Sequence, residues 1–154
     1  MAYVSKFQDL IVYQKARVHW RAIFEITKSF PKEERFSLTD QIRRSSRSVG
    51  AQIAEAWGKR RYQKHFLSKL TDADSEELET QHWIGVAKDS GYISDKEAQE
   101  LLLQAEEIGR LLGGMMRKSA MFCNASKINE VQADYFEDEA LTTTTDHRIL
   151  NTDH

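Results

Sequence analysis

Apolar side chains recur every three or four positions over most of the chain, a spacing that places them on one face of an α-helix. The first such segment follows Asp9, which is predicted to be its N-cap, and Pro31 ends it. Its inner face is predicted to comprise Tyr13, Ala16, Trp20, Ile23, Phe24, Thr27 and Phe30. The second segment begins at Ser37, with Asp40 three residues later as an approximate capping box, and Gly58 lies near its end. Its predicted inner face comprises Leu38, Ile42, Ser45, Val49, Ile53 and Ala56.

A third helix is predicted over about residues 62–90, with Gly91 supplying the left-handed conformation that ends many helices. Its inner face comprises Phe66, Leu70, Ala73, Thr80, Ile84 and Ala87. Glu77 falls on that same face, so we expect it to be buried and paired, or to lie at the edge of the face. The fourth helix opens with "SDKE", a capping box formed by Ser94 and Glu97. Its inner face comprises Ala98, Leu101, Leu102, Ala105, Ile108, Leu112, Met115 and Ser119.

Short connections between long amphipathic helices favour antiparallel neighbours. The predicted fold class is therefore all-α, an up-down-up-down antiparallel four-helix bundle formed by residues 1–123. After Cys123 the periodicity ends. Residues 124–154 contain a threonine run and a surplus of acid, and are predicted to form a flexible acidic C-terminal tail with a short helix at about residues 130–141.

The composition narrows the class of protein further. One cysteine, Cys123, excludes an internal disulfide framework and fits a reducing compartment. Neither a bilayer-spanning apolar run nor the apolar core of a signal peptide is present, so we expect a soluble cytoplasmic protein that does not enter a membrane.

Charge is segregated along the chain although the formal net charge is only −2. Residues 35–69 hold nine Lys or Arg and two acidic residues, a balance of +7. Residues 70–107 have eleven acidic and two basic residues, a balance of −9, and residues 124–154 have a balance of −5. Oppositely charged neighbouring helices attract one another within a subunit or between subunits, and the small net charge provides no general attraction to nucleic acid.

The second helix combines small and basic residues on a stripe predicted to face outward. At about 100° per residue the stripe comprises Arg43, Arg47, Gly50, Ala54, Gly58 and Arg61. Small residues allow close approach of another backbone, so a neighbouring subunit or a phosphate backbone is expected to cover this surface. The more conservative interpretation is structural: Arg43, Arg44 and Arg47 form ion pairs with the acidic face of the third helix, or lie in an oligomer interface. The acidic residues of that face are Asp72, Glu76 and Glu79. A second cluster at the junction with the third helix is harder to neutralise locally, and is the predicted nucleic-acid-binding site: Lys59, Arg60, Arg61 and Lys64.

Catalytic and metal sites are weakly supported. Glu79 and His82 have the Glu-x-x-His spacing of di-iron bundles, but no second copy of the motif accompanies them. No histidine lies near Cys123 in the sequence, and there is no glycine-rich phosphate loop. We expect no enzymatic activity, no metal, no cofactor and no small-molecule substrate. A carboxylate metalloenzyme is the weakest alternative, which metal analysis would expose.

Several long stretches together resemble a known family. They are "FQDLIVYQKA", "SFPKEERFSLTDQIRRSSRSVGAQIAEAWGKR", "FLSKLTDADSEELETQHW" and "SGYIS", which together cover about residues 7–118. The chain resembles the small bacterial four-helix-bundle proteins encoded within intervening sequences of 23S ribosomal RNA genes. It departs from the family pattern at Gln52, where asparagine is frequent, and at Ala56, where glycine is frequent.

The resemblance implies a four-helix bundle that assembles into a ring, typically a homopentamer, without known enzymatic activity. A related branch, the accessory proteins of diversity-generating retroelements, binds a reverse transcriptase and nucleic acid, but that branch is more basic. We therefore expect a non-catalytic, homo-oligomeric binding or scaffold protein associated with RNA, a ribonucleoprotein or a nucleic-acid-processing protein. The alternative is a protein-binding adaptor with no nucleic-acid role, in which the acidic tail is the recognition segment.

Overall fold

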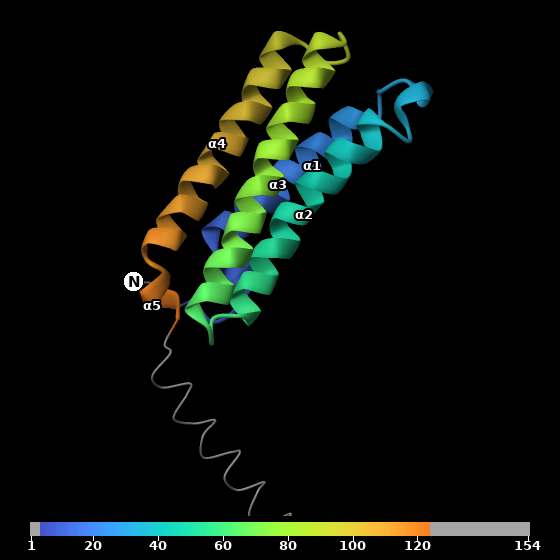
Figure 1. Cartoon of the computed structure of the whole chain (residues 1–154). Helices are drawn as coiled ribbons and strands as arrows, with labels where there is room; N and C mark the ends of the chain where they lie inside the picture. Colours follow the sequence, from blue (N-terminus) through green and yellow to red (C-terminus); the bar gives the residue numbers. More distant parts are fainter. Residues whose placement is uncertain (1–3, 124–154) are drawn as a thin grey trace, which may run out of the picture.

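The structure is a computed structural model that describes residues 4–123. Figure 1 shows the long helices side by side. The long helices are α1 (Ile11–Thr27), α2 (Leu38–Gly58), α3 (Gln63–Asp89) and α4 (Asp95–Arg117). The short ones are η1 (Phe7–Asp9), η2 (Lys32–Glu34) and α5 (Ser119–Phe122). Residues 124–154, for which a tail with a short helix was predicted, lie outside the described residues.

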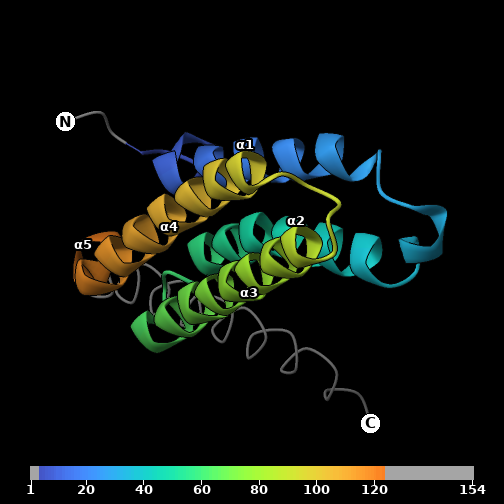
Figure 2. The ribbon, with the colours of Figure 1, turned by 90° about the horizontal axis from the view of Figure 1, so that it is seen from above.

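The helices pack in a closed cycle, α1 against α2, α2 against α3, α3 against α4 and α4 against α1. Seen from above, α1 and α3 lie on opposite sides, with α2 and α4 between them (Figure 2). The prediction of an all-α, up-down-up-down bundle is confirmed. Over residues 4–123 there is no strand, and no helix there is both long and apolar enough to cross a membrane.

Two of the four predicted helix caps are confirmed in detail. Ser94 accepts a hydrogen bond from the Glu97 N–H, and the Glu97 carboxylate accepts one from the Ser94 N–H, completing the capping box of α4. Gly91 has a φ of +76°, the left-handed conformation predicted for the residue that follows α3. These two features fix the tight connection between α3 and α4.

The predicted N-cap of α1 is wrong, and Ser37 precedes α2 as predicted but forms no capping box. Asp9 belongs to η1, and Leu10 precedes α1. Ser37 precedes α2, but its hydroxyl donates to the Glu34 carboxylate (2.6 Å) and makes no cap. The same carboxylate accepts the Leu38 N–H at 3.2 Å, so a residue of the preceding turn satisfies the helix end. The hydrogen bonds from Ser37 and Leu38 lower the pKa of Glu34, against a small opposing effect of burial.

The core consists of two apolar clusters. One lies around Val12, Ile53, Phe66, Leu70 and Leu112, toward the end of the bundle where α2 joins α3. The other lies around Ile23, Ile42, Ile84, Ala98 and Leu101, toward the opposite end. In the sequence of α1, α2 and α3, buried polar residues fall between the members of the two clusters: His19, Ser45, Glu77 and Thr80. We call these four residues the polar layer.

The inner faces of α2 and α3 are as predicted, but that of α1 is rotated slightly. The buried residues of α1 are Val12, Ala16, His19, Ile23 and Thr27. Tyr13, Trp20 and Phe24 are only half-buried and line the side of α1 that faces α2. These three large aromatic residues were predicted to lie on the inner face. The inner face is instead formed by the smaller residues beside them.

Candidate nucleic-acid interface

The junction between α2 and α3 gathers the predicted nucleic-acid-binding residues at one end of the bundle. Lys59 and Lys64 are exposed, and Arg60 and Arg61 are half-buried. The Arg60 guanidinium lies 3.4 Å from the centre of the Trp57 ring, and its Nε donates to the Trp57 carbonyl at 2.8 Å. Arg60, in the connection between the two helices, is therefore fixed against the end of α2.

The other three cations are less engaged. The Arg61 guanidinium lies 5.3 Å from the centre of the Tyr62 ring. Among the described residues, no ion pair involves Lys59, Arg61 or Lys64. We refer to these three residues as the junction cations.

The beginning of α3 adds a second source of positive potential at the same place. Tyr62 precedes the helix and makes no side-chain cap, and no acidic residue lies in the first turn. The first N–H groups of a long helix point outward and carry a partial positive charge, which favours a bound anion. Junction cations and helix end together form a surface suited to a phosphate group.

By contrast, the cations along the seam between α2 and α3 are neutralised within the chain. Arg44 contacts Glu79 and lies 3.6 Å from a carboxylate oxygen of Glu76. Burial tends to raise the pKa of Glu79, but the hydrogen bond and charge of Arg44 outweigh it and hold that pKa below its ordinary value. The pKa of Glu76 is raised, mainly by burial and further by the hydrogen bond with Glu79. The charge of Arg44 lowers this pKa but offsets the increase only in part.

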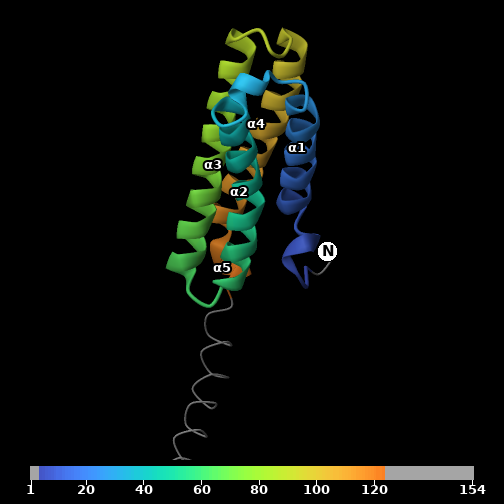
Figure 3. The same cartoon turned by 90° about the vertical axis from the view of Figure 1, so that its right-hand side faces the viewer.

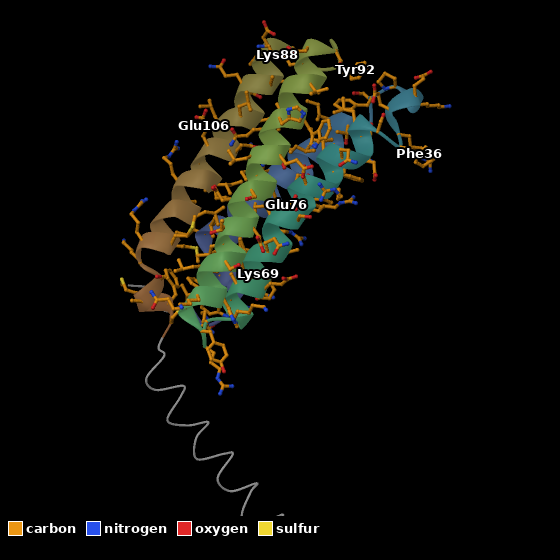
Figure 4. All side chains as sticks on the ribbon, in the orientation of Figure 1. Phe36, Lys69, Glu76, Lys88, Tyr92 and Glu106 are labelled. Carbon is orange, nitrogen blue, oxygen red and sulfur yellow. The ribbon has the colours of Figure 1, made fainter. Side chains whose placement is uncertain are left out.

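Lys69 is neutralised on the same seam (Figure 4). Its Nζ lies 2.9 Å from Glu55 and 3.5 Å from Asp72, and it donates to the Gln52 side chain at 3.3 Å. The hydrogen bond with Glu55 is the main cause of a raised pKa of Lys69. Asp72 thus pairs with a lysine of its own helix, where an arginine of α2 was expected. Gln52, which differs from the residue frequent in the resembling family, contributes an acceptor here.

Arg43 and Arg47 lie on another side of α2. Successive residues of a helix are about 100° apart, so Arg43 faces α1 while Arg44 faces α3. The Arg43 Nε donates to the Thr27 hydroxyl at 2.8 Å. The Arg47 guanidinium lies 5.2 Å from the centre of the Trp20 ring. Of the three arginines expected to pair with the third helix, only Arg44 does so within residues 4–123.

The stripe of small residues on α2 faces outward only at its end, where Gly58 is exposed. Gly50 is buried, and a Cβ built at this position would lie 3.5 Å from the Tyr13 ring. Ala54 is half-buried beside it, in a groove between α1 and α2. The small residues on this part of α2 therefore accommodate the aromatic side chains of the same chain.

The sequence predicted a pairing for Glu77 but not its partner. Glu77 and His19 are each 1% exposed, and His19 Nδ1 lies 3.5 Å from Glu77 Oε1. His19 is three residues after Ala16 and four before Ile23, both buried. That spacing was the available signal for a buried histidine.

The Glu-x-x-His motif does not assemble a metal site. Glu79 is bound by Arg44, and the His82 ring contacts the Trp83 ring edge-on with centroids 4.7 Å apart. In the described part of the chain, no three His, Cys, Asp or Glu side chains are grouped so as to hold a metal ion.

Comparison with known proteins assigns the family. The sequence profile of the 23S rRNA-intervening sequence protein family matches residues 8–114. The chain belongs to this family. The match spans α1, α2 and α3 and most of α4, so the matched region includes the junction between α2 and α3.

A solved structure of the same fold comes from Bacteroides thetaiotaomicron and is described as a protein with unknown function from the S23 ribosomal protein family. It is 28% identical, with a TM-score of 0.63, and the alignment covers 69% of this chain and 98% of that one. No curated protein matches the chain significantly. Neither description includes a catalytic activity.

Proposed function

We propose that the protein is a non-catalytic, homo-oligomeric scaffold of the cytoplasm that binds structured RNA through the junction between α2 and α3. The observation that supports RNA binding most directly is the contrast between two sets of cations. Arg44 and Lys69 are paired with carboxylates of the chain. The junction cations have no such partner among the described residues and lie beside the uncapped start of α3.

Phosphate groups are the ligand class that suits this surface. Lysine and arginine contact phosphate oxygens, and helix N-termini contribute N–H donors to the same oxygens. Exposed base-stacking aromatics are few at the junction, with Tyr62 at 51% exposure as the clearest candidate. The surface therefore suits recognition of a phosphate backbone more than reading of a base sequence. The family name refers to 23S rRNA, which makes structured ribosomal RNA the first ligand to test.

A different surface supports self-association. Ile11 and Val18 are 63% and 53% exposed on α1. Ile11 also lines an apolar groove with Leu111 and Met115 of α4. Exposed apolar surface of this kind is typical of protein interfaces. Charge attraction between the basic and acidic segments of neighbouring subunits contributes less to the proposed assembly than the sequence suggested. Arg44 and Lys69 already form ion pairs with carboxylates of their own chain.

The test of RNA binding is a titration of the full chain with fluorescently labelled ribosomal RNA fragments, followed by anisotropy at low and physiological salt. A phosphate-backbone contact makes the logarithm of the binding constant fall with the logarithm of salt concentration, by about 0.7 to 0.9 per contact. We expect steep salt dependence for the native chain. In the variant Lys59→Ala/Arg61→Ala/Lys64→Ala we expect both weaker binding and a slope reduced by about 2 to 3.

The matched control removes three cations elsewhere, in Arg21→Ala/Lys28→Ala/Arg110→Ala. It has the same change in net charge, so a specific junction site predicts little effect on the salt slope. Equal losses in both triple variants would indicate attraction by general charge alone. Absence of binding at low salt would refute the proposed RNA role and favour a protein-binding adaptor.

Self-association is tested separately by sedimentation of Ile11→Glu/Val18→Glu. Carboxylates on the α1 surface are expected to shift the protein toward monomer, because they would be buried without partners in an apolar interface. Leu78→Glu, at a position 58% exposed on α3, is the matched control and should leave the assembly unchanged.

A further inference from the structure

A groove of about 400 Å³ lies between α1 and α2. Figure 3 shows these two helices side by side. Small side chains of α2, including Gly50 and Ala54, line one side. The aromatic rings of Tyr13 and Trp20 from α1 line the other. The lining is mainly apolar, so the groove favours an occupant with apolar side chains of its own.

Two arginines give the groove a strong preference for an acidic occupant. The guanidiniums of Arg17 and Arg47 lie 5.8 Å and 5.2 Å from the centre of the Trp20 ring. Arg17 also donates to the Tyr13 hydroxyl at 3.4 Å. Within residues 4–123 neither arginine is in an ion pair, and the buried Trp20 Nε1 has no hydrogen-bond acceptor. The two exposed guanidiniums thus flank an apolar trough, and each is able to bind a carboxylate.

We infer that residues 131–141 of the same chain occupy this groove. The segment is "VQADYFEDEAL", which combines the apolar side chains of Val131, Tyr135, Phe136 and Leu141 with four carboxylates and no basic residue. Its apolar residues match the lining of the groove, and its charge is opposite to that of Arg17 and Arg47. This inference does not depend on RNA binding at the junction.

The segment is within reach of the groove. The described chain ends at Cys123, beside the junction: Gln63 of α3 donates to Ser119 at 2.7 Å, and Phe66 stacks on Phe122. From the end of α2 at Gly58 back to Arg47 the helix rises about 17 Å, at about 1.5 Å per residue. Residues 124–130 can extend about 23 Å, at about 3.3 Å per residue. The connecting residues are therefore long enough to bring residue 131 to the groove.

A second groove lies closer to Cys123 but suits the segment less well. It is lined by Leu10, Leu111, Met115 and Phe122, and by Asp9 as its one charged residue. An acidic segment placed there would have a carboxylate beside its own carboxylates and no cation to balance them. Charge complementarity therefore selects the groove between α1 and α2.

The inference is tested by a nitroxide spin label near the segment in the full chain. Thr142→Cys in a Cys123→Ala background provides a single attachment site. The readout is the set of indole ¹⁵N–¹H signals of the three tryptophans. We expect the Trp20 signal to lose most of its intensity, and the signal of Trp83, which packs against the other apolar cluster, to change least. Equal broadening of the two signals would overturn the inference.

Four variants of the labelled chain, two of them controls, make the result specific. Tyr135→Ser/Phe136→Ser removes apolar side chains that would enter the groove, and should restore the Trp20 signal. Thr144→Ser/Thr145→Ser, a conservative change just beyond the label, should not. Arg47→Glu should also restore the signal, whereas Arg110→Glu on α4 should leave it broadened. Failure of the first and third variants to restore the signal would contradict occupation of this groove.

Mixing separates the same chain from a neighbouring one. ¹⁵N-labelled protein without the nitroxide is mixed with unlabelled protein that carries it. Retained Trp20 intensity is expected, because the segment is bound by its own chain. Loss of the signal in this mixture would overturn the assignment and place the segment of another copy in the groove. None of these measurements contains RNA, so their failure is distinct from failure of the proposed function.

Discussion

His19 of α1 and Glu77 of α3 face each other in the interior, with Nδ1 and Oε1 3.5 Å apart and 1% of each side chain exposed. Neither Glu77 carboxylate oxygen nor His19 Nε2 has a hydrogen-bond partner among the described residues. Burying such a pair costs the free energy of hydration of both groups, and their mutual attraction offsets that cost only in part. The fold is therefore expected to be stable when both members are present or when both are replaced, and less stable when only one is replaced.

Removing one member of this pair should destabilise the protein far more than removing both. We expect Glu77→Leu or His19→Leu alone to lower the free energy of unfolding by about 3 kcal/mol, because an unpaired polar group remains buried. His19→Leu/Glu77→Leu should be close to the native protein or more stable. Urea unfolding measures all three. Additive losses in the double variant would contradict the expectation, and His82→Leu at the surface is the control.

The pair between Arg44 and Glu79 predicts a dependence on pH. Arg44 holds the pKa of Glu79 below its ordinary value, so Glu79 stabilises the fold above its unfolded-state pKa, and this contribution is lost as the pH falls through its folded-state pKa. In Arg44→Gln, burial still raises the pKa of Glu79, and the positive charge that lowers this pKa is gone. The pKa of Glu79, followed by NMR, should rise, and the acid-dependent loss of stability should shrink.

Lys28→Gln is the control for that titration, because Lys28 forms an exposed pair with Glu25 on another helix. It should leave the pKa of Glu79 unchanged. A Glu79 titration that is the same in Arg44→Gln and in the native chain would show that the pair has no effect in solution.

Gly91 and Gly85 should respond oppositely to the same substitution. Gly91 has a positive φ, so Gly91→Ala introduces backbone strain of about 1 kcal/mol. Gly85 lies inside α3 with nothing within 4 Å of a built Cβ. Gly85→Ala should therefore stabilise the protein by about 0.5 to 1 kcal/mol, since alanine is the better helix former. Thermal unfolding of the two variants compares the effects, and equal shifts would contradict both assignments.

The capping box at the start of α4 provides a prediction with a close control. Ser94→Ala removes the acceptor for the Glu97 N–H and should lower stability by about 1 kcal/mol. Ser68→Ala changes an exposed serine within α3 and should have little effect or a slightly favourable one. Chemical denaturation of both variants checks the difference. A loss in Ser68→Ala as large as that in Ser94→Ala would argue against a role for the cap.

Much of the fold could be predicted because periodicity and local hydrogen bonding determine it. The inner faces of α2 and α3, the Ser94 cap and the Gly91 turn depend on residues within a few positions of one another. The start of α2 could not be predicted in the same way. There Glu34 of the preceding turn binds the Leu38 N–H. Glu34 and Asp40 are each three residues from Ser37, and nothing in the sequence shows which of the two carboxylates satisfies the helix end.

The candidate site was harder to predict because it depends on which helix lies beside which side chain. Adjacent arginines Arg43 and Arg44 have the same chemistry, yet one faces Thr27 and the other Glu79. Gly50 was expected on an outward stripe because its size allows a neighbour, and the neighbour is Tyr13 of the same chain. His19 was overlooked because the aromatic residues beside it dominate the apolar pattern of α1.

The polar layer also determines how the helices can move. Sliding α3 along α1 by one helical turn, about 5.4 Å, would carry Glu77 away from His19 and into one of the apolar clusters. It would also separate Thr80 from Ser45, whose hydroxyls are 2.9 Å apart. The polar layer thus favours a single register of the helices, and sliding of one helix along its axis against the others is disfavoured. A change at one end of the bundle is therefore not expected to reach the other end by sliding of α3 along its axis.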